Sequence, residues 1–354
     1  MIDRRNSRKV FVGNVAVGGG APVTVQSMTG AAVDDVEGTV RQIDECMDAG
    51  AAIMRVSVPN EIAAETLSKV IKRAKIPIVA DIHYDWRMAI LSADAGAACL
   101  RINPSNIGSE KGVRELVAAA KANKCSIRIG VNAGSLEKDL LEKYGEPCAD
   151  AMAESALVQA RMLQDLGFGD IKISAKASDV KMTIEAYEKI AEAGDWPLHL
   201  GVTEAGGLTD GSIKNAMAFG YLLGRGIGDT IRVSLSAEPV EEVRAGIKML
   251  RAFGLCDRGL NIVSCPTCSR KCFDVIKIVR MLEEKYPDIK AKVKVAVMGC
   301  IVNRQEAGRV DVGVYGSDRG EAMLCVHAKE PEKIAETDIL ARLCKEIDKV
   351  ICNM

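Results

Sequence analysis

The stretch IKISAKASDVKMTIEAYEKIAEAGDWPLHLGVT, residues 171–203, contains one complete strand–helix–strand unit. Residues 171–175 alternate apolar and polar side chains, which indicates a strand, and residues 198–203 form a second run of this kind. Between them, residues 178–194 begin with Ser-Asp, a common helix start, and end at a glycine, a common helix stop. Strands joined through a helix run parallel, so the unit predicts a parallel sheet covered by helices.

The same period recurs from about residue 22 to residue 255. Strands are predicted at residues 23–26, 53–58, 76–81, 99–103, 127–132, 171–175, 198–203 and 231–235. Helices are predicted at residues 34–50, 60–74, 85–96, 109–123, 150–167, 178–194, 211–226 and 238–254. Eight such units in this length favour a TIM (β/α)8 barrel. An open doubly wound sheet is the alternative, although no G-x-G-x-x-G motif follows the first strand.

Two segments lie outside this repeat. Residues 9–22, KVFVGNVAVGGGAP, precede the first strand and are interpreted as a hairpin lid on the barrel. After Leu255 the period ends, and the following elements are a helix at 273–286, strands at 292–298, 310–315 and 322–327, and a closing helix at 331–351. The predicted domains are therefore a barrel, residues 1–255, and a smaller α+β domain, residues 256–354.

The composition limits the class of protein. Of the 354 residues, 48% are hydrophobic, which is enough for a well-buried core. The net charge of −1 indicates no general attraction to nucleic acid or to a membrane surface. No apolar run has the length of a membrane span and the start MIDRRNSRK is charged, so we expect a soluble, cytoplasmic protein. In a reducing compartment, the 12 cysteines favour metal binding or redox chemistry over disulfides.

Charged and polar residues collect at the predicted carboxyl ends of the strands, where TIM barrels carry their functional sites. The candidates are Arg55, Asp81, His83, Arg101, Asn103, Arg128, Asn132, Lys176, Glu204, Arg232 and Ser234. A converging set of cations and amides from different strands matches the oxygens of a phosphate or diphosphate. Any single member has an alternative interpretation as an interior ion pair or a charge at the rim. The whole set predicts a small, phosphorylated ligand.

Two of these candidates have competing interpretations. Glu204 differs in sign from most of its neighbours and is either the partner of an arginine or the general acid/base of the site. His83, in the stretch ADIHYD, either contacts the ligand or is a histidine bonded to Asp81. Because the chain has 3 histidines in all, a three-histidine metal site is not expected.

A cysteine cluster follows the predicted barrel. SCPTCSRKC contains Cys265, Cys268 and Cys272, and Cys300 follows in MGC. A C-P-x-C turn directs two thiolates at one metal centre, which a distant cysteine then completes. A zinc ribbon usually has a second C-x-x-C, whereas Cys300 stands alone, so the pattern favours a [4Fe–4S] cluster with one open iron. A structural zinc site is the alternative.

These motifs together resemble the 4-hydroxy-3-methylbut-2-enyl diphosphate synthases of the non-mevalonate isoprenoid pathway, in their two-domain bacterial form. The matching stretches span nearly the whole chain and include VQSMT, RVSVP, ADIHYD, LRINPSNIG, RIGVNAGSLEKDLLEKYG, HLGVTEAGG, SCPTCSRKCFDV and MGCIVN. The resemblance implies a barrel that binds 2-C-methyl-D-erythritol 2,4-cyclodiphosphate and a [4Fe–4S] domain that reduces it to the linear diphosphate. It also implies flavodoxin or ferredoxin as the electron donor, and a homodimer in which two subunits share each active site.

The resemblance further implies roles for individual residues. Diphosphate contacts fall on Arg55, His83, Arg128, Lys176, Arg232 and Ser234, with Asp81, Arg101, Asn103 and Asn132 beside them. Glu204 matches the acid near the substrate hydroxyl, and Asn303 keeps a polar position that we expect to face the substrate. The cluster ligands fall on Cys265, Cys268 and Cys300.

Two loops differ from the family pattern. The family follows its third cysteine with N-G-P-G-E-A, whose glutamate is the fourth iron ligand, whereas this chain reads NRQEA, one residue shorter. Glu306 is the nearest carboxylate here, and water and Cys272 are the alternative fourth ligands. The family also follows Q-S-M-T with N-T-x-T, whereas this chain has GAAV at residues 30–33. Both loops are expected to face one cavity, which favours altered specificity over surface drift.

The leading hypothesis is therefore a reductive iron–sulfur enzyme that makes 4-hydroxy-3-methylbut-2-enyl diphosphate from the cyclodiphosphate. One alternative is a diverged homologue that acts on another phosphorylated compound, which the two altered loops favour. A second alternative is a noncatalytic cluster or zinc protein that binds a diphosphate metabolite. The presence of Glu204 and of the full basic set argues against the second.

Overall fold

The structure, a computed structural model, describes residues 3–103, 107 and 110–353. It divides the chain into two compact units, Met1–Cys256 and Asp257–Met354. Part of the predicted LRINPSNIG motif and Ser109, the first residue of a predicted helix, lie outside the described residues.

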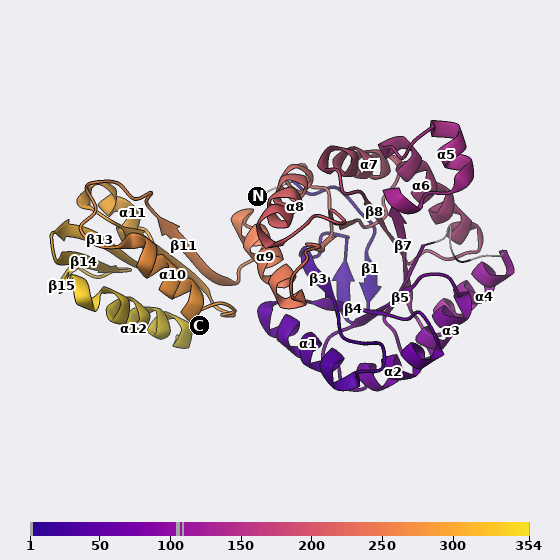
Figure 1. The fold of residues 1–354 in the computed structure, drawn as a ribbon, viewed down its shortest axis with the longest axis horizontal. Helices are drawn as coiled ribbons and strands as arrows, with labels where there is room; N and C mark the ends of the chain where they lie inside the picture. Colours follow the sequence, from indigo (N-terminus) through magenta and orange to yellow (C-terminus); the bar gives the residue numbers. More distant parts are fainter. Residues whose placement is uncertain (1–2, 104–106, 108–109, 354) are drawn as a thin grey trace. The chain divides into compact units, whose positions relative to one another are not determined.

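The first unit is a closed barrel of parallel strands surrounded by helices (Figure 1). Its strands are β3 (Thr24–Met28), β4 (Ile53–Ser57), β5 (Ile78–Ile82), β6 (Cys99–Ile102), β7 (Ser126–Asn132), β8 (Ile171–Lys176), β9 (His199–Leu200) and β10 (Thr230–Ile231). Within the described residues they form one eight-stranded sheet in the order β8-β7-β6-β5-β4-β3-β10-β9. A parallel bridge between Ile173 and Leu198 joins the two edges and closes the sheet. The predicted TIM barrel is confirmed.

Amphipathic helices cover the outside of the barrel. They are α1 (Val36–Ala49), α2 (Glu61–Ile71), α3 (Trp86–Asp94), α4 (Glu110–Ala122), α6 (Ala149–Asp165), α7 (Val180–Ala193), α8 (Leu208–Gly224) and α9 (Pro239–Ala252). Several begin at a side-chain cap: Asp35 accepts a hydrogen bond from the Gly38 N–H, and Asp179 accepts one from the Met182 N–H. Such caps satisfy backbone donors that have no partner inside the helix. The sequence analysis does not predict the short helix α5 (Lys138–Tyr144).

The last two barrel strands are shorter than predicted. β9 and β10 have two residues each, so Arg232 and Ser234 follow β10 instead of lying on it. The Arg232 N–H still donates to Leu200 O at 2.9 Å. The Leu235 N–H, however, donates to the carboxylate of Glu242 on α9 at 3.0 Å. The chain leaves the sheet here because a helix side chain has replaced the neighbouring strand as its hydrogen-bond partner.

The amino-terminal hairpin forms the floor of the barrel. β1 (Val10–Val12) pairs antiparallel with β2 (Val15–Val17). The apolar cluster below the strands contains Val12, Val17, Ile53, Val79 and Cys99. The barrel members of this cluster stand at or near the first residue of their strands. The interpretation of the hairpin as a lid is therefore wrong. Its apolar face packs against the apolar amino ends of the strands, opposite to the carboxyl ends where a lid would lie.

The second unit is a mixed sheet with helices on both faces. Its strands are β11 (Gly259–Ser264), β12 (Lys292–Met298), β13 (Val312–Asp318), β14 (Glu321–Val326) and β15 (Glu332–Ala335), paired in that order. The first three strands are parallel and the last two pairings are antiparallel. Helices α10 (Val275–Lys285) and α12 (Ile339–Cys352) pack against one face, and the short α11 (Arg304–Gly308) packs against the other.

Two strands of this unit differ from the sequence analysis. β11 is not predicted, and the predicted helix 331–351 contains β15 in its first turn. Helix α12 begins only at Ile339, since residues 332–335 pair with β14 along the sheet edge. Sheet pairing here overrides the local helical pattern.

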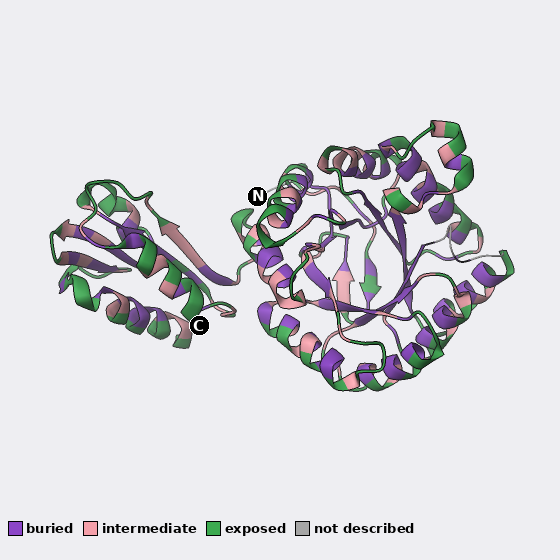
Figure 2. Cartoon of the chain, in the orientation of Figure 1, coloured by how far each residue is buried: buried purple, intermediate pink, exposed green. Residues whose placement is uncertain are grey.

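Burial follows the two sheets, whose strands are largely buried while the outer helix faces are exposed (Figure 2). The main core lies between the barrel and its ring of helices, and a separate core lies in the second unit. Within the described part of the chain, no helix combines the length and apolar character of a membrane span.

The hairpin floor makes a prediction about stability. Val12→Ala removes buried methyl groups from the floor and should lower the free energy of unfolding by about 2 kcal/mol, measured by urea denaturation. Phe11→Ala is the matched control, because the neighbouring Phe11 side chain is 55% exposed and its loss should change stability by less than about 0.5 kcal/mol. Equal losses in the two variants would contradict the assignment of the floor.

Candidate functional site

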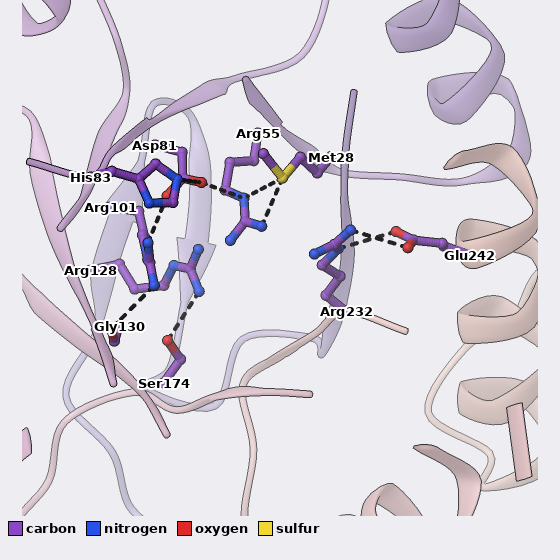
Figure 3. A network of polar contacts seen from close by, with 10 residues as sticks. All are labelled: Met28, Arg55, Asp81, His83, Arg101, Arg128, Gly130, Ser174, Arg232 and Glu242. Atoms are coloured by element: carbon purple, nitrogen blue, oxygen red, sulfur yellow. Dashed lines mark hydrogen bonds and ion pairs between the residues drawn. The ribbon is translucent and has the colours of Figure 1, made fainter. Parts of the chain in front are cut away.

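The interior of the barrel is lined by cations from the middle and from the carboxyl ends of its strands. The set comprises Arg55 on β4, Arg101 on β6, Arg128 on β7, Lys176 on β8 and Arg232 after β10. The first four are buried, and Arg101 and Arg128 stand in register on neighbouring strands. Figure 3 shows the four arginines around the same space. The sequence analysis selected all five, and the structure brings them together.

Asp81 on β5 is the carboxylate within this set. It contacts Arg101 Nη1 at 3.1 Å, His83 Nε2 at 3.2 Å and Arg55 Nε at 3.7 Å (Figure 3). Burial alone would raise the pKa of Asp81, but the charge of Arg55, the hydrogen bond with His83 and the charge of Arg101 lower the pKa well below its usual range. Asp81 therefore stays ionised and holds two guanidinium groups. His83 is bonded to Asp81, as one of its two interpretations expects.

A second carboxylate, which the sequence analysis misses, orients Arg232. Glu242 on α9 is 3% exposed and accepts hydrogen bonds from Arg232 Nε and Nη2, each at 3.1 Å (Figure 3). It also accepts from Ser27 Oγ at 2.6 Å and from the Leu235 N–H at 3.0 Å. Glu242 thereby ties β3, the loop after β10 and α9 together. Glu242 lies in the stretch EPVEEV, which resembles the acidic first turn of many helices. No feature of the sequence therefore identifies Glu242 as the partner of an arginine.

Arg128 and Lys176 have no carboxylate partner among the contacts of the described residues. Arg128 Nη1 donates to Ser174 Oγ at 3.1 Å, whereas its Nε and Nη2 meet no partner in the part of the chain that the structure describes. Burial lowers the pKa of Arg128 to about 10, with a further lowering by Arg101. Burial also lowers the pKa of Lys176 well below its usual value, and the neighbouring arginines add to this effect. Two desolvated cations without a counter-ion favour an anion at this position.

Glycines make room for these long side chains. A Cβ at Gly130 would lie 2.4 Å from Arg101 Nε, and a Cβ at Gly201 would lie 2.5 Å from Lys176 Nζ. The Arg101 Nη2 group also donates to Gly130 O at 3.2 Å. Any side chain at either glycine would displace a cation from the site.

Polar residues on three consecutive loops line the rim. A pocket of about 520 Å³ is lined by residues that include Asn132, Ser135, Asp179, Thr203 and Glu204. Glu204 is exposed and has a backbone φ of +52°, a strained value for a residue other than glycine. In the described residues it makes no ion pair with an arginine, which leaves the acid/base interpretation in place. Such strain is common where a side chain is held for function.

The remaining barrel candidates lie at the same end. Asn103 Nδ2 donates to Ser135 Oγ at 2.9 Å, which joins the loops after β6 and β7. Ser234 is half-buried in the loop after β10. The altered loop GAAV follows β3, where the N–H groups of Gly30 and Ala31 donate to Gln42 Oε1 at 2.9 and 3.2 Å. A helix α1 side chain thus holds the loop that departs from the family pattern.

In the second unit, two of the predicted cluster cysteines come from neighbouring parallel strands. Cys265 follows β11 and Cys300 lies two residues after β12. The Cys265 N–H donates to Val297 O at 3.3 Å, which continues the pairing of the two strands. Cys265 Sγ accepts a hydrogen bond from the Gly299 N–H at 3.2 Å. Backbone donors to sulfur are a regular feature of iron–sulfur sites, so this arrangement fits a cluster.

The other two cysteines lie in the loop between β11 and α10. Cys268 is exposed, and Cys272 is held against the Gly299 loop because its N–H donates to Gly299 O at 2.7 Å. A Cβ at Gly316 would lie 2.7 Å from the Cys272 Cβ, so β13 must carry a glycine there. Burial raises the pKa of the Cys272 thiol, and Cys300 raises it further. Cys272 precedes α10, which begins at Val275.

The stretch NRQEA forms a turn of 3-10 helix followed by α11. Asn303 is exposed at the end of the 3-10 turn, Ile301–Asn303. Glu306 forms an ion pair with Arg309 at 3.4 Å. In the described residues, no three or more His, Cys, Asp or Glu side chains are arranged to hold a metal ion. Two features fit a cluster here: Cys265 and Cys300 follow neighbouring parallel strands, and a backbone N–H donates to Cys265 Sγ.

Both units match models of one protein family. Residues 7–247 match the GcpE TIM-barrel domain, and residues 261–349 match the GcpE protein C-terminal domain.

Named relatives match over almost the whole chain. A 4-hydroxy-3-methylbut-2-en-1-yl diphosphate synthase (flavodoxin) from Ruegeria sp. (strain TM1040) is 52% identical over 349 residues, which cover 98% of this chain and 93% of the relative. The protein of the same name from Ruegeria pomeroyi is 53% identical and covers 98% of this chain and 92% of its own. The one from Zymomonas mobilis is 49% identical with the same coverage.

Solved structures match the barrel fold at low identity. A phospho-2-dehydro-3-deoxyheptonate aldolase from Thermotoga maritima has a TM-score of 0.51 at 14% identity and covers 70% of this chain and 75% of its own. An N-acetylneuraminic acid synthetase from Leptospira borgpetersenii has a TM-score of 0.50 at 14% identity, with coverage of 70% and 90%. These likenesses show the fold alone.

The contacts of Asp81 make a prediction about pH. Asp81→Asn leaves Arg55 and Arg101 without their carboxylate and should lower the free energy of unfolding at pH 7 by about 3–5 kcal/mol. Because the folded-state pKa of Asp81 is lowered, its contribution is complete above the unfolded pKa of about 3.9 and is lost as the pH falls further. The stability difference between the two proteins should therefore begin to shrink below about pH 4 and should shrink further as the pH falls toward the lowered pKa of folded Asp81.

Urea denaturation at several pH values measures this effect. Asp85→Asn is the matched control, since Asp85 lies in the same stretch but forms an exposed pair with Arg87. Asp85→Asn should lower the free energy of unfolding by less than about 1 kcal/mol at any pH. A difference between wild type and Asp81→Asn that stays constant down to acid pH would contradict the lowered pKa.

Proposed function

The chain belongs to the GcpE family, and we propose that it is a 4-hydroxy-3-methylbut-2-enyl diphosphate synthase. In this proposal, 2-C-methyl-D-erythritol 2,4-cyclodiphosphate takes up two electrons and two protons. The ring opens and one oxygen leaves as water, which gives (E)-4-hydroxy-3-methylbut-2-enyl diphosphate. The names and nearly full-length identity of the curated relatives support this activity. The observation that carries it is the set of buried cations at the barrel mouth.

The diphosphate binds between the cations in this proposal. Arg128 and Lys176 offer guanidinium and ammonium donors that have no carboxylate partner in the described residues. Arg55 and Arg232 stand beside them, oriented by Asp81 and by Glu242. The further proposed contacts are His83, Arg101, Asn103, Asn132, Ser234 and Asn303. The anionic oxygens of the diphosphate would act as counter-ions to these buried cations and would accept their hydrogen bonds.

Glu204 is the proposed acid/base group. It stands at the rim next to the pocket that Asn132 also lines. The strained backbone fixes the position of the Glu204 carboxyl group at the rim, from which it can donate a proton to the departing hydroxyl group.

The proposed cofactor is a [4Fe–4S] cluster held by Cys265, Cys268 and Cys300. Such a cluster supplies electrons one at a time and, at an iron without a thiolate, a Lewis acid for substrate oxygen. The fourth ligand proposed first is Glu306, and Cys272 and water are the alternatives. Glu306 pairs with Arg309 in the structure, so binding iron requires it to exchange that partner.

The proposal includes partners and location. The proposed electron donor is flavodoxin or a ferredoxin. Flavodoxin is part of the names of the relatives. A homodimer in which two subunits share each active site would bring cluster and barrel together. The location is the cytoplasm, where the thiols stay reduced.

An activity measurement tests this function. Protein purified without oxygen should be brown, with about four irons per chain, and should convert the cyclodiphosphate to the linear diphosphate with reduced flavodoxin. Lys176→Met should lower kcat/KM by at least about 30-fold, because a buried charge that meets the diphosphate is lost. Lys181→Met is the matched control, since its side chain is 85% exposed and pairs only with Glu185 on α7.

The outcomes separate the alternatives. A brown protein that yields no linear diphosphate favours a diverged homologue with another phosphorylated substrate. A colourless protein that carries zinc contradicts both enzyme hypotheses. Full activity in Lys176→Met would remove the anion site from the proposal.

The fourth ligand has its own prediction. Glu306→Ala should change the electron paramagnetic resonance and visible absorption spectra of the reduced cluster, because its open iron would lose a carboxylate. Gln305→Ala, an exposed neighbour on the same short helix, should leave both spectra unchanged. If Glu306→Ala leaves them unchanged and Cys272→Ser changes them, Cys272 is the ligand instead.

A further inference from the structure

A further group of buried polar side chains reaches deeper into the barrel and shares one member, Arg128, with the proposed diphosphate site. We call it the inner layer: Gln26 on β3, Arg128 on β7, Lys172 on β8 and His199 on β9. Their exposures are 0%, 1%, 0% and 0%. Lys172 precedes Lys176 by four residues on β8, so it stands nearer the hairpin floor.

Strand alternation directs these side chains inward. On β8, Ile171 and Ile173 pack in the core outside the barrel, and Ser174 bonds inward to Arg128. Lys172 therefore shares the inner face with Ser174. Lys172 and Arg128 are also direct partners in the register of β7 and β8. Two cations thus stand side by side inside a sealed barrel.

The inner layer has an excess of hydrogen-bonding groups without partners. In the described residues, no partner reaches Lys172 Nζ, His199 Nε2, Arg128 Nε and Nη2, or either amide atom of Gln26. The other ring nitrogen of His199 is bonded to Thr230 Oγ1 at 2.8 Å. An unsatisfied buried polar group is costly, and native proteins rarely leave several together. Something other than protein must bond to these atoms.

The charge of the inner layer selects an anion over water alone. Its unpartnered groups are mostly donors, and two of them belong to cations. The carboxylates nearest along the sheet are already engaged, Asp81 by Arg55 and Arg101 and Glu242 by Arg232. Water would satisfy hydrogen bonds but would leave two buried positive charges without a counter-ion.

The neighbouring Cys125 and Tyr187 side chains do not supply negative charge either. Burial raises the pKa of the Cys125 thiol and of the Tyr187 hydroxyl far above neutrality, so both stay protonated. Tyr187 also donates its hydroxyl hydrogen to His199 O at 2.6 Å. Burial lowers the pKa of Lys172, and Arg128 lowers it further, which a bound anion would reverse. The floor below is apolar.

We propose that the inner layer is a buried binding site for a small monovalent inorganic anion, such as chloride. The anion lies between Lys172 and Arg128, with His199 and Gln26 completing its shell. It is separate from the diphosphate, which lies above at Lys176 and Arg232. The anion accepts from Nε and Nη2 of Arg128, while Nη1 donates one of its two hydrogens to Ser174 Oγ and directs the other at the substrate. This inference goes beyond the proposed function and does not depend on it.

Bromide replacement tests the site directly. The full chain, purified and crystallised without substrate and with bromide in place of chloride throughout, should show an anomalous scattering peak between Lys172 and Arg128. The same crystals of Lys172→Met should lack this peak. Water density without anomalous signal at the inner layer would overturn the proposal. So would a peak confined to the mouth, at Lys176 and Arg232, because it would belong to the diphosphate site.

Thermal unfolding provides a second measurement. The midpoint of the wild type should rise by roughly 2–4 °C between about 1 mM and about 200 mM chloride, relative to gluconate, an organic anion too large for the site. Lys172→Met should show no such chloride dependence. Lys189→Met, on the exposed face of α7 where it pairs with Asp150, should keep the wild-type response. Equal responses to chloride and gluconate in the wild type would contradict the proposal, even if Lys172→Met fails to fold.

Discussion

The burial of positive charge inside the barrel is the constraint on which the rest of the site depends. Arginine and lysine side chains on neighbouring strands point into a space that water cannot freely enter, where each charge raises the cost of the next. Two carboxylates offset part of this cost. Asp81 holds Arg55 and Arg101 from within the sheet, and Glu242 holds Arg232 from a helix outside it. The remaining positive charge favours an anion inside the barrel.

The fold supplies the supports that this charge requires. Glycines leave room for Arg101 and Lys176, and an apolar hairpin packs against the amino ends of the strands. In the second unit, parallel pairing of β11 and β12 brings Cys265 and Cys300 to one edge of the sheet. The buried cations and the cysteine pair thus lie on separate units. In the proposed reaction the barrel binds the diphosphate and the second unit delivers the electrons.

Much of the fold follows from the sequence, and the exceptions share a cause. The strand–helix period identifies the barrel because each unit repeats the same local pattern. Besides the unpredicted α5 and β11, the exceptions are the ends of β9 and β10, the strand β15 and the role of the hairpin as a floor. In each case a partner distant in sequence decides the outcome: Glu242 for the loop after β10, β14 for β15, and the strand ends for the hairpin. Local patterns carry no information about such partners.

The sequence by itself determined the barrel, the family, the basic residues of the mouth and the cysteines of the second unit. These follow from periodic patterns and motifs, which are local in the chain. Only the tertiary structure decided which cations are neutralised and which are not. It revealed Glu242 as the partner of Arg232 and Lys172 as a buried cation without one. The reason is physical. In water, the free energy of a charged side chain depends little on its position in the sequence. Inside a barrel, that free energy depends on neighbouring groups that only folding brings close.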